Sequence, residues 1–180
     1  ADPDIQAKAR ERLAPFGSRM RFFNRWYDEF FADCPLERSP DRILFDLGIS
    51  VFHYVESGRG FSFSKDEPLD MRLSSTAGPG VAEWLGRCTE AELAGVLFGF
   101  GEERYGRRIA RAILAERERS GAGVFREMGA AGLAKLIWDA VPADYRHGRL
   151  HPATRSFQAL RIQVNGELER IQRALTGAFA

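Results

Sequence analysis

The carboxylate of Asp46 follows the apolar run Ile43, Leu44 and Phe45 and precedes Gly48. This pattern is typical of a buried parallel strand that ends in an acid, and open α/β sheets bind ligands beyond the carboxyl ends of their strands. We therefore expect Asp46 to accept a hydrogen bond from a bound ligand. The alternative is that Asp46 caps the helix that follows it.

A second set of chemical groups lies between residues 55 and 80, a stretch rich in glycine, serine, aspartate and proline. It is too long for a simple connection, which favours a functional loop. The loop carries two arginines and two phenylalanines: Arg59, Phe61, Phe63 and Arg72. Such a mixture suits the stacking of bases and the anchoring of phosphates. Alternatively, the phenylalanines attach the loop to the core, and Arg72 pairs with Asp70.

The C-terminal residues 154–178 predict one long helix with two different faces. Its apolar stripe consists of Phe157, Leu160, Val164, Leu168, Ile171 and Leu175. Arg155, Gln158 and Asn165 project from another face, where we expect them to be available to a ligand. His151 and Arg155 stand at the start of the helix, where the backbone amides favour an anion.

A row of arginines has helical spacing: Arg104, Arg107, Arg108 and Arg111. Such a row is usually a solvated helix face, although the same spacing suits a track of phosphates. Ile109 and Ile113 supply the buried side of this helix.

Composition limits the class of protein. With a net charge of +1 the chain has no overall basic field, although nearly all of its cations are arginine, which suits planar contacts with phosphates and bases. A GC-rich genome would produce the same bias.

Cys34 and Cys88 stand alone, so neither a disulfide framework nor a metal site is predicted. No apolar run is long enough to span a membrane and no signal-peptide pattern is present, so we expect a soluble, cytoplasmic protein.

The elements that must position these groups belong to an α/β fold. We expect strands at residues 20–24 and 42–46. Helical patterns cover residues 3–15, 81–87, 90–99, 103–118 and 125–141. Thr89 and Glu92 form a capping-box signature at the start of one of them. The helices after residue 80 are not interrupted by any strand pattern, which indicates a separate helical block.

Five segments together resemble the RsmH (MraW) family of ribosomal RNA methyltransferases. They are DLGIS at 46–50, RGFSF at 59–63, PLDMR at 68–72, GEERY at 101–105 and HPATRSFQALRI at 151–162. The resemblance implies a Rossmann-like class I methyltransferase domain with an inserted all-helical domain. It also implies transfer of a methyl group from S-adenosylmethionine to the N4 amine of a cytosine in small-subunit ribosomal RNA.

The resemblance assigns roles to individual residues. Asp46 is implied to be catalytic and to contact the cofactor, and Trp26 to pack near the adenine, where the family more often has phenylalanine. An aromatic residue after a strand is as often simply part of the core. His53 occupies the position of a common cofactor-contacting glutamine. The expected RNA contacts are Arg59, Phe61, Phe63, Arg72, Arg155, Gln158 and Asn165, and no metal ligand is implied.

The chain departs from the family pattern at both ends. It begins just after the strand that would carry the ribose-binding acid, and it lacks the glycine-rich loop and two strands of the family's sheet. We therefore expect an incomplete α/β fold, with residues 1–72 in a partial methyltransferase segment, 73–150 in the inserted domain and 151–180 in the returning helix. The expected partner is small-subunit ribosomal RNA or the small ribosomal subunit. The alternatives are a helical module that binds RNA or protein without catalysis, and an inactive structural remnant.

Overall fold

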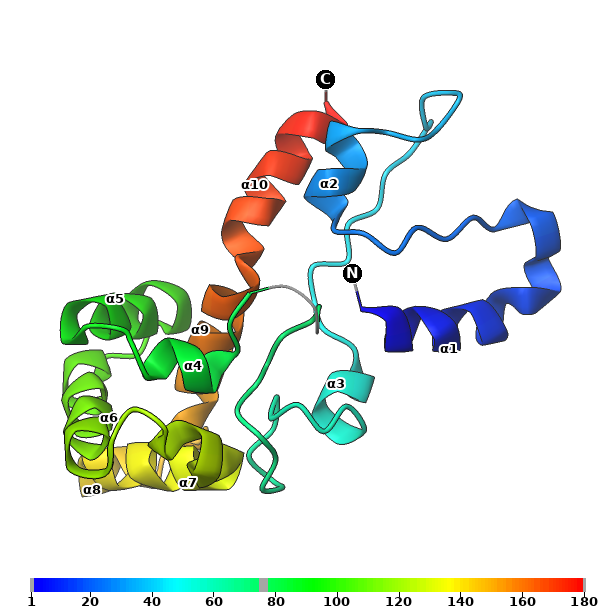
Figure 1. Cartoon of the computed structure of the whole chain (residues 1–180). Coiled ribbons are helices and arrows are strands. Elements are labelled where there is room, and N and C mark those ends of the chain that lie inside the picture. Colours follow the sequence, from blue (N-terminus) through cyan, green and yellow to red (C-terminus); the bar gives the residue numbers. More distant parts are fainter. Residues whose placement is uncertain (1, 75–77, 180) are drawn as a thin grey trace. The chain divides into compact units, whose positions relative to one another are not determined.

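The computed structural model describes residues 2–74 and 78–179, which form helices joined by loops (Figure 1). The chain divides into two compact units. The first unit comprises Ala1–Ser50, Leu73–Ser75 and Gly166–Ala180, and the second comprises Val51–Arg72 and Thr76–Asn165. We describe each unit by itself.

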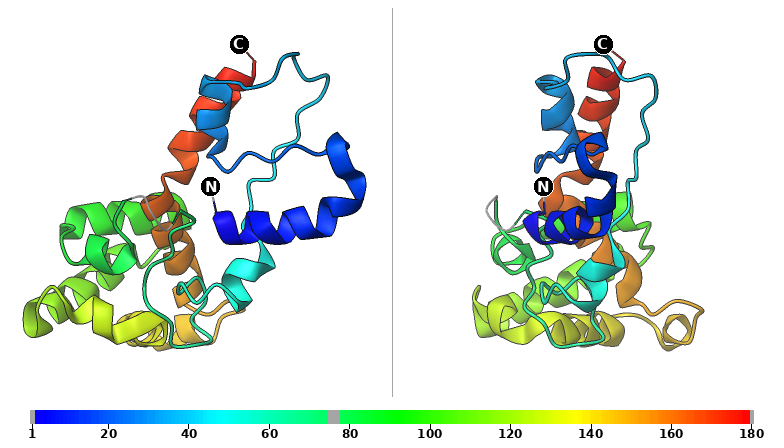
Figure 2. Two further views of the ribbon diagram at one scale, coloured as in Figure 1. Left: turned by 45° about the vertical axis from the view of Figure 1, so that its right-hand side comes forward. Right: turned by 90° about the vertical axis from the view of Figure 1, so that its right-hand side faces the viewer.

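The first unit is built from helix α1 (Pro3–Leu13), the 3-10 helix η1 (Ala14–Arg19), α2 (Tyr27–Ala32) and α10 (Glu167–Ala178). Asp2 caps α1, because its Oδ1 accepts a hydrogen bond of 2.9 Å from the amide of Asp4. Helices α2 and α10 lie side by side (Figure 2). Arg170 and Arg173 of α10 both donate to the buried carboxylate of Asp28 in α2, so an ionic cluster holds this pair together.

The expected strands are not formed. Residues 20–24 and 42–46 have no regular secondary structure, and residues 2–74 and 78–179 contain no strand. A strand needs a neighbour for its backbone N–H and C=O groups, and the described residues supply none for either segment. The apolar run before Asp46 therefore lies open, and Leu44 is 94% exposed. The α/β class predicted a sheet from these two segments, and the structure shows irregular chain at both.

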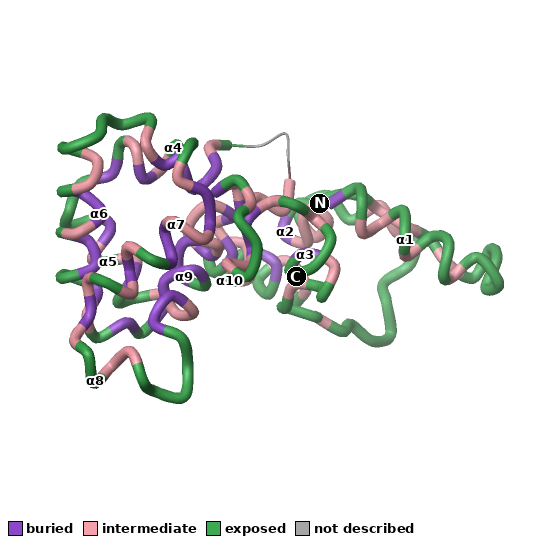
Figure 3. Tube along the Cα trace, turned by 90° about the horizontal axis from the view of Figure 1, so that it is seen from below, coloured by how far each residue is buried: buried purple, intermediate pink, exposed green. Residues whose placement is uncertain are grey.

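In the described part of the second unit, every regular element is a helix. These helices are α3 (Val51–Val55), α4 (Val81–Leu85), α5 (Glu90–Gly101), α6 (Gly106–Ser120), α7 (Val124–Ala140), α8 (Ala143–Arg146) and α9 (Ala153–Asn165). α5 packs against both α6 and α9, while α7 contacts α4, α6 and α9. Figure 3 shows buried residues gathered in α6, α7 and α9, whereas α1 of the first unit has none. The predicted helices from residue 81 to residue 141 are confirmed within a few residues, and so is the capping box of Thr89.

Residues 56–72, which follow α3, form a segment that packs into the second unit. Its residues Phe61, Leu69 and Met71 are buried. Gly60, with φ of 73°, donates its amide to Glu67, and the carbonyl of Glu67 accepts from Ala130 in α7. Gly129, with φ of 67°, breaks the helical geometry of α7 where Asp66 approaches. The segment is therefore an anchored part of the core.

The predicted C-terminal helix is divided in two. Gly166 adopts a left-handed conformation with φ of 58°, so that α9 ends at Asn165 and α10 begins at Glu167. Glycine takes this conformation without the steric cost that other residues meet. The apolar stripe from Phe157 to Leu175 thus belongs to two helices and to both units.

Candidate functional site

One cavity in the second unit collects several of the side chains that the sequence analysis selected. We call it the aromatic pocket; it has a volume of about 200 Å³ and is lined by Tyr54, Phe61, Ser62, Phe63, Thr154, Phe157, Gln158 and Arg161. These residues come from the end of α3, from the anchored segment after it and from the first nine residues of α9. The pocket therefore brings together Phe61, Phe63 and Gln158.

Packing fixes the aromatic walls. Phe157 is 4% exposed, and its ring meets that of Phe63 edge to face with centroids 5.0 Å apart. The Phe63 ring lies 4.6 Å from the imidazole of His151, which stacks on Trp138 at 5.1 Å. Such aromatic contacts add directional attraction to apolar burial. The wall that carries Phe63 is thus held in place by three other rings.

His151 supports this wall as a neutral side chain. Its Nδ1 accepts a hydrogen bond of 3.1 Å from the amide of Ala153, in the first turn of α9. Burial lowers the pKa of His151 below its ordinary value. His151 therefore accepts a hydrogen bond at the start of α9, where the sequence analysis expected an anion.

The lining of the aromatic pocket suits a flat, partly polar ring. Phenyl rings supply stacking surfaces, the amide of Gln158 offers both a donor and an acceptor, and the hydroxyls of Ser62 and Thr154 lie in the same lining. Arg161 adds a guanidinium, which pairs well with phosphate. Stacking combined with hydrogen bonds to a base edge is how proteins recognise unstacked RNA bases.

Arg59 and Arg72 are engaged in the fold of the second unit. Arg59 Nη1 donates to the carbonyl of Arg72 at 2.9 Å, and its guanidinium lies over the Phe61 ring. Arg72 donates from Nε and Nη2 to the two carboxylate oxygens of Asp70, at 2.6 and 2.8 Å. Burial would raise the pKa of Asp70, but the hydrogen bonds and charge of Arg72 outweigh it and lower the pKa. The packing of Phe61 and Phe63 on other rings and the pairing of Arg72 with Asp70 are the contacts that the alternative expected, while RNA contacts of these residues stay predictions.

Two of the three polar residues predicted on the last helix make internal contacts. Arg155 Nη1 donates to the carbonyl of Glu102 at 2.8 Å. Asn165 is buried, and its Nδ2 donates to the carbonyls of Met71 and Arg161 at 2.8 and 2.9 Å. Asn165 thus fastens the end of the anchored segment to α9 and does not project from an open face as its spacing suggested. Gln158, by contrast, is exposed in the pocket.

The three residues expected to contact a cofactor lie in different settings. Asp46 is exposed in the first unit, and its Oδ1 accepts a hydrogen bond of 3.2 Å from the amide of Gly48. It does not cap a helix, because the next helix begins at Val51. Trp26, also in the first unit, is half-buried under the guanidinium of Arg170, 4.3 Å from the ring. His53, in the second unit, is buried with its ring 5.2 Å from that of Phe61.

Four lining residues escaped the sequence analysis: Tyr54, Ser62, Thr154 and Arg161. Two of them carried a usable signal, since Thr154 and Arg161 stand four residues before and three residues after Gln158. Residues at these spacings share one face of a helix. Extending the face of Gln158 by one turn in each direction would have found both.

The described part of the chain contains no cluster of histidine, cysteine, aspartate and glutamate that could hold a metal ion. Its helices also include none that is long and apolar enough to cross a membrane.

Comparison with known proteins gives a consistent result. The model of the MraW methylase family matches residues 1–180. Ribosomal RNA small subunit methyltransferase H of Treponema denticola is 52% identical over 181 residues, which cover 100% of this chain and 56% of that protein. The proteins of the same name from Saccharopolyspora erythraea and Treponema pallidum are 44% and 41% identical. Their matches cover 99% of this chain and 53% and 54% of those proteins, so the chain spans about half the length of the curated relatives it matches.

Proposed function

This chain belongs to the MraW methylase family, and from that membership we propose that it serves in methylating the N4 amine of a cytosine in small-subunit ribosomal RNA. The observation that carries the proposal is the family match over residues 1–180, together with relatives named as small-subunit ribosomal RNA methyltransferases. The aromatic pocket supports it independently, because its chemistry suits an unstacked base.

We propose that the aromatic pocket holds an RNA base. Phe63, which is half-buried, offers a ring surface for stacking, and the buried ring of Phe157 supports it from the side. The amide of Gln158 pairs with the polar edge of the base. Arg161 is placed to meet a phosphate of the same strand. A base can enter such a pocket only after it leaves its stack, and single-stranded or unpaired regions meet that condition at the lowest cost.

S-adenosylmethionine is the proposed methyl donor, and the residue types present fit it. The donor supplies an electrophilic methyl group on a sulfonium. Asp46 presents an exposed carboxylate, which would accept a hydrogen bond from the methionine part of the donor or from the target amine. The indole of Trp26 would pack near the adenine, and His53 retains one hydrogen-bonding nitrogen of the kind that a glutamine amide would supply.

Transfer to an amine needs no covalent intermediate with the protein. Cys88 is buried and burial raises the pKa of its thiol, while Cys34 is exposed. Neither thiol is therefore assigned a role, and the chemistry rests on positioning the amine and accepting its hydrogen bond.

The exposed segments at 20–24 and 42–46 also gain an explanation. We propose that they are strands of a Rossmann-like methyltransferase sheet in a protein of the relatives' length. Support comes from Ile43 and Leu44, whose apolar side chains are exposed here and would be covered by helices in such a sheet.

The role of Asp46 is tested in a protein of the relatives' length that carries this sequence. Methyl transfer from labelled S-adenosylmethionine to small ribosomal subunits is measured, and the modified base is identified by mass spectrometry. Asp46→Asn is expected to lower turnover by at least about 100-fold, the scale of a positioned carboxylate. Asp41→Asn, at an exposed site on the same segment, is the matched control. Equal turnover of the two variants would remove Asp46 from the mechanism.

The aromatic pocket is tested separately by RNA affinity of the chain. Gln158→Ala and Gln163→Ala change the same residue type on α9, but only Gln158 lines the pocket. Gln158→Ala and Phe63→Ala are expected to weaken binding of a single-stranded RNA by about tenfold, since stacking alone contributes about 1–3 kcal/mol per base. Gln163→Ala should bind as the unaltered chain does.

A helical module that binds RNA without catalysis is the second candidate function. The observation in its favour is that the aromatic pocket is formed entirely by residues of the second unit. If RNA affinity depends on Gln158 while no variant or longer protein transfers a methyl group, this second function is the correct one.

A further inference from the structure

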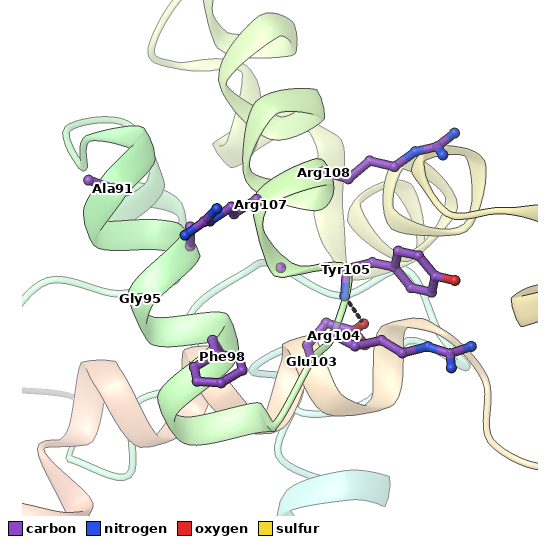
Figure 4. Close-up of a pocket in the computed structure, with 10 residues that line it drawn as sticks. Ala91, Gly95, Phe98, Glu103, Arg104, Tyr105, Arg107 and Arg108 are labelled. Atoms are coloured by element: carbon purple, nitrogen blue, oxygen red, sulfur yellow. Dashed lines mark hydrogen bonds between the residues drawn. The ribbon is translucent and has the colours of Figure 1, made fainter.

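A larger cavity lies elsewhere on the second unit, between α5 and α6. We call it the α5–α6 groove; its volume is about 670 Å³, and its lining includes Gly95, Phe98, Arg104, Tyr105, Arg107 and Arg108 (Figure 4). None of these residues lines the aromatic pocket. In Figure 4 Arg107 extends toward α5, while Arg104 and Arg108 extend on either side of Tyr105.

The side of the groove formed by α5 is open and apolar. Ala91 and Gly95 present little or no side chain, and a Cβ added at Gly95 would meet no atom within 4 Å. One turn further along, Phe98 is 71% exposed. An exposed phenyl ring beside an open helix face gives a flat apolar surface on which a planar group can lie.

The side formed by α6 is positively charged. Arg107 and Arg108 are exposed and have no ion pair within the described chain, whereas Arg111 in the next turn pairs with Glu90 at 3.0 Å. The one acidic group of the lining, Glu103, is fully buried. It accepts hydrogen bonds of 2.8 Å from the Tyr105 amide and from the Tyr145 hydroxyl, so its carboxylate is occupied within the fold.

Arg104 is oriented by aromatic rings. Its guanidinium lies 4.9 Å from the centre of the Tyr105 ring and 4.6 Å from that of Tyr145. Stacking of this kind restricts a guanidinium while its N–H groups remain able to donate at the edge. The groove thus combines an open ring with a restrained cation and two further cations.

We propose that the α5–α6 groove binds a single-stranded segment of the RNA substrate, outside the position of the reacting base. The inference rests on the proposed function and extends it to a second contact surface. Phe98 stacks on a base, and Arg104, Arg107 and Arg108 bind phosphates of the same strand. An acidic peptide would satisfy the arginines but would leave the open phenyl surface without a planar partner.

Two glycines of α5 provide a matched test of occupancy. Gly95 and Gly99 are both exposed on the helix with nothing within 4 Å of an added Cβ, but only Gly95 lines the groove. Leucine is a better helix former than glycine, so both substitutions leave α5 stable. Gly95→Leu is expected to lower the affinity of the full chain for a labelled oligouridylate of about 12 nucleotides by at least tenfold. Gly99→Leu is expected to leave it unchanged.

The arginines are tested through salt dependence. Each phosphate contact on a single strand contributes about 0.7 to the slope of log affinity against log salt concentration. Arg107→Ala and Arg108→Ala are each expected to reduce the slope by about that amount. Phe98→Ala is expected to weaken binding and to leave the slope unchanged. Arg111→Ala is the control, because Arg111 already has an acidic partner.

Each outcome decides the proposal. Equal affinities of Gly95→Leu and Gly99→Leu, or no binding of the oligonucleotide by the unaltered chain, would overturn it. The proposal would also be overturned if a hexaglutamate peptide bound as tightly as RNA and Gly95→Leu blocked both equally. That result would identify a protein partner. If Gln158→Ala weakens binding while Gly95→Leu does not, the groove is rejected and the proposed function stands. If Gly95→Leu weakens binding and no methyl transfer is found, the groove stands and the proposed catalysis fails.

Discussion

Asp28 shows how one buried carboxylate holds the first unit together. Its oxygens accept hydrogen bonds of 2.8 Å from Arg170 and 2.6 Å from Arg173. Burial alone would raise the pKa of Asp28, but the hydrogen bonds and charges of Arg173 and Arg170 outweigh this and lower it. A carboxyl group with a depressed pKa stabilises the folded state above its unfolded pKa of about 3.9, and this contribution disappears as the pH falls through the folded pKa.

We therefore expect the first unit to lose stability below about pH 4. Asp28→Asn should remove about 1.5–3 kcal/mol at pH 7, the usual contribution of hydrogen bonds to charged groups, and should flatten the acid dependence. Unfolding of the first unit is followed by the fluorescence of Trp26, which contacts Arg170. The measurement uses a protein in which Trp84 and Trp138 are replaced by phenylalanine. Asp33→Asn, at a side chain that is 93% exposed, serves as the control. An unchanged acid dependence in Asp28→Asn would contradict this account.

Asn165 gives a second prediction at the scale of the residue. Its amide donates to the Met71 carbonyl inside the second unit, and Met71 itself is fully buried with φ of 54°. Asn165→Ala leaves that carbonyl without its partner, so we expect a loss of about 1–3 kcal/mol in the free energy of unfolding. Urea titration of the variant beside Gln163→Ala measures the loss. Equal midpoints for the two variants would show that water replaces the amide.

At the scale of the elements, α5 and α9 approach each other closely at Gly101. A Cβ added there would lie 2.5 Å from the carbonyl oxygen of Arg155 and 3.1 Å from the Cβ of Ala159. Gly101→Ala should therefore destabilise the second unit by about 1–3 kcal/mol, as overpacked cores do. Gly99→Ala, on the same helix but in open space, should stabilise it by about 0.5–1 kcal/mol. If the midpoint temperatures of thermal unfolding of Gly101→Ala and Gly99→Ala shift in the same direction, this account of the contact is wrong.

The helices could be predicted from the sequence where local signals agree. Apolar spacing and the Thr89 cap located α5, and similar spacing located α6 and α7. The break at Gly166 was missed because a single glycine is also tolerated inside a helix at a cost of about 1 kcal/mol. The apolar runs at residues 20–24 and 42–46 predicted strands, which are not formed. A strand depends on partners distant in sequence, and a local pattern does not supply them.

For the candidate site, the sequence predicted which types of residue take part better than it predicted where their side chains lie. Phe61, Phe63 and Gln158 were selected for their chemistry, and the structure places all three in the aromatic pocket. Arg72 and Asn165 were selected for the same reason, yet their partners are Asp70 and the Met71 carbonyl. Residue type alone does not separate a ligand contact from an internal hydrogen bond, because both use the same donors.

The whole molecule should unfold in two steps. Among the described residues, the buried hydrophobic side chains lie in the second unit, apart from Ala174. Apolar burial is the main source of folding stability, so the first unit should unfold at lower urea concentration. Hydrogen exchange should be faster in α2 and α10 than in α5 and α9, and Asp28→Asn should move only the first transition. A single transition seen by every probe would contradict independent units.

The pairing of α2 with α10 also bears on the order in which the chain folds. Asp28 and Arg170 are separated by 142 residues, and the intervening chain contains the whole set of helices from α3 to α9. Closing a disordered loop of that length costs about 4 kcal/mol of chain entropy, and early folding of the intervening helices lowers this cost. Among those helices, α5 with α6 and α6 with α7 are neighbours in sequence and pack together, and contacts of this kind form quickly. During synthesis, Asp28 emerges well before Arg170, so the pairing of α2 with α10 forms only after helices α3 to α9 have been made.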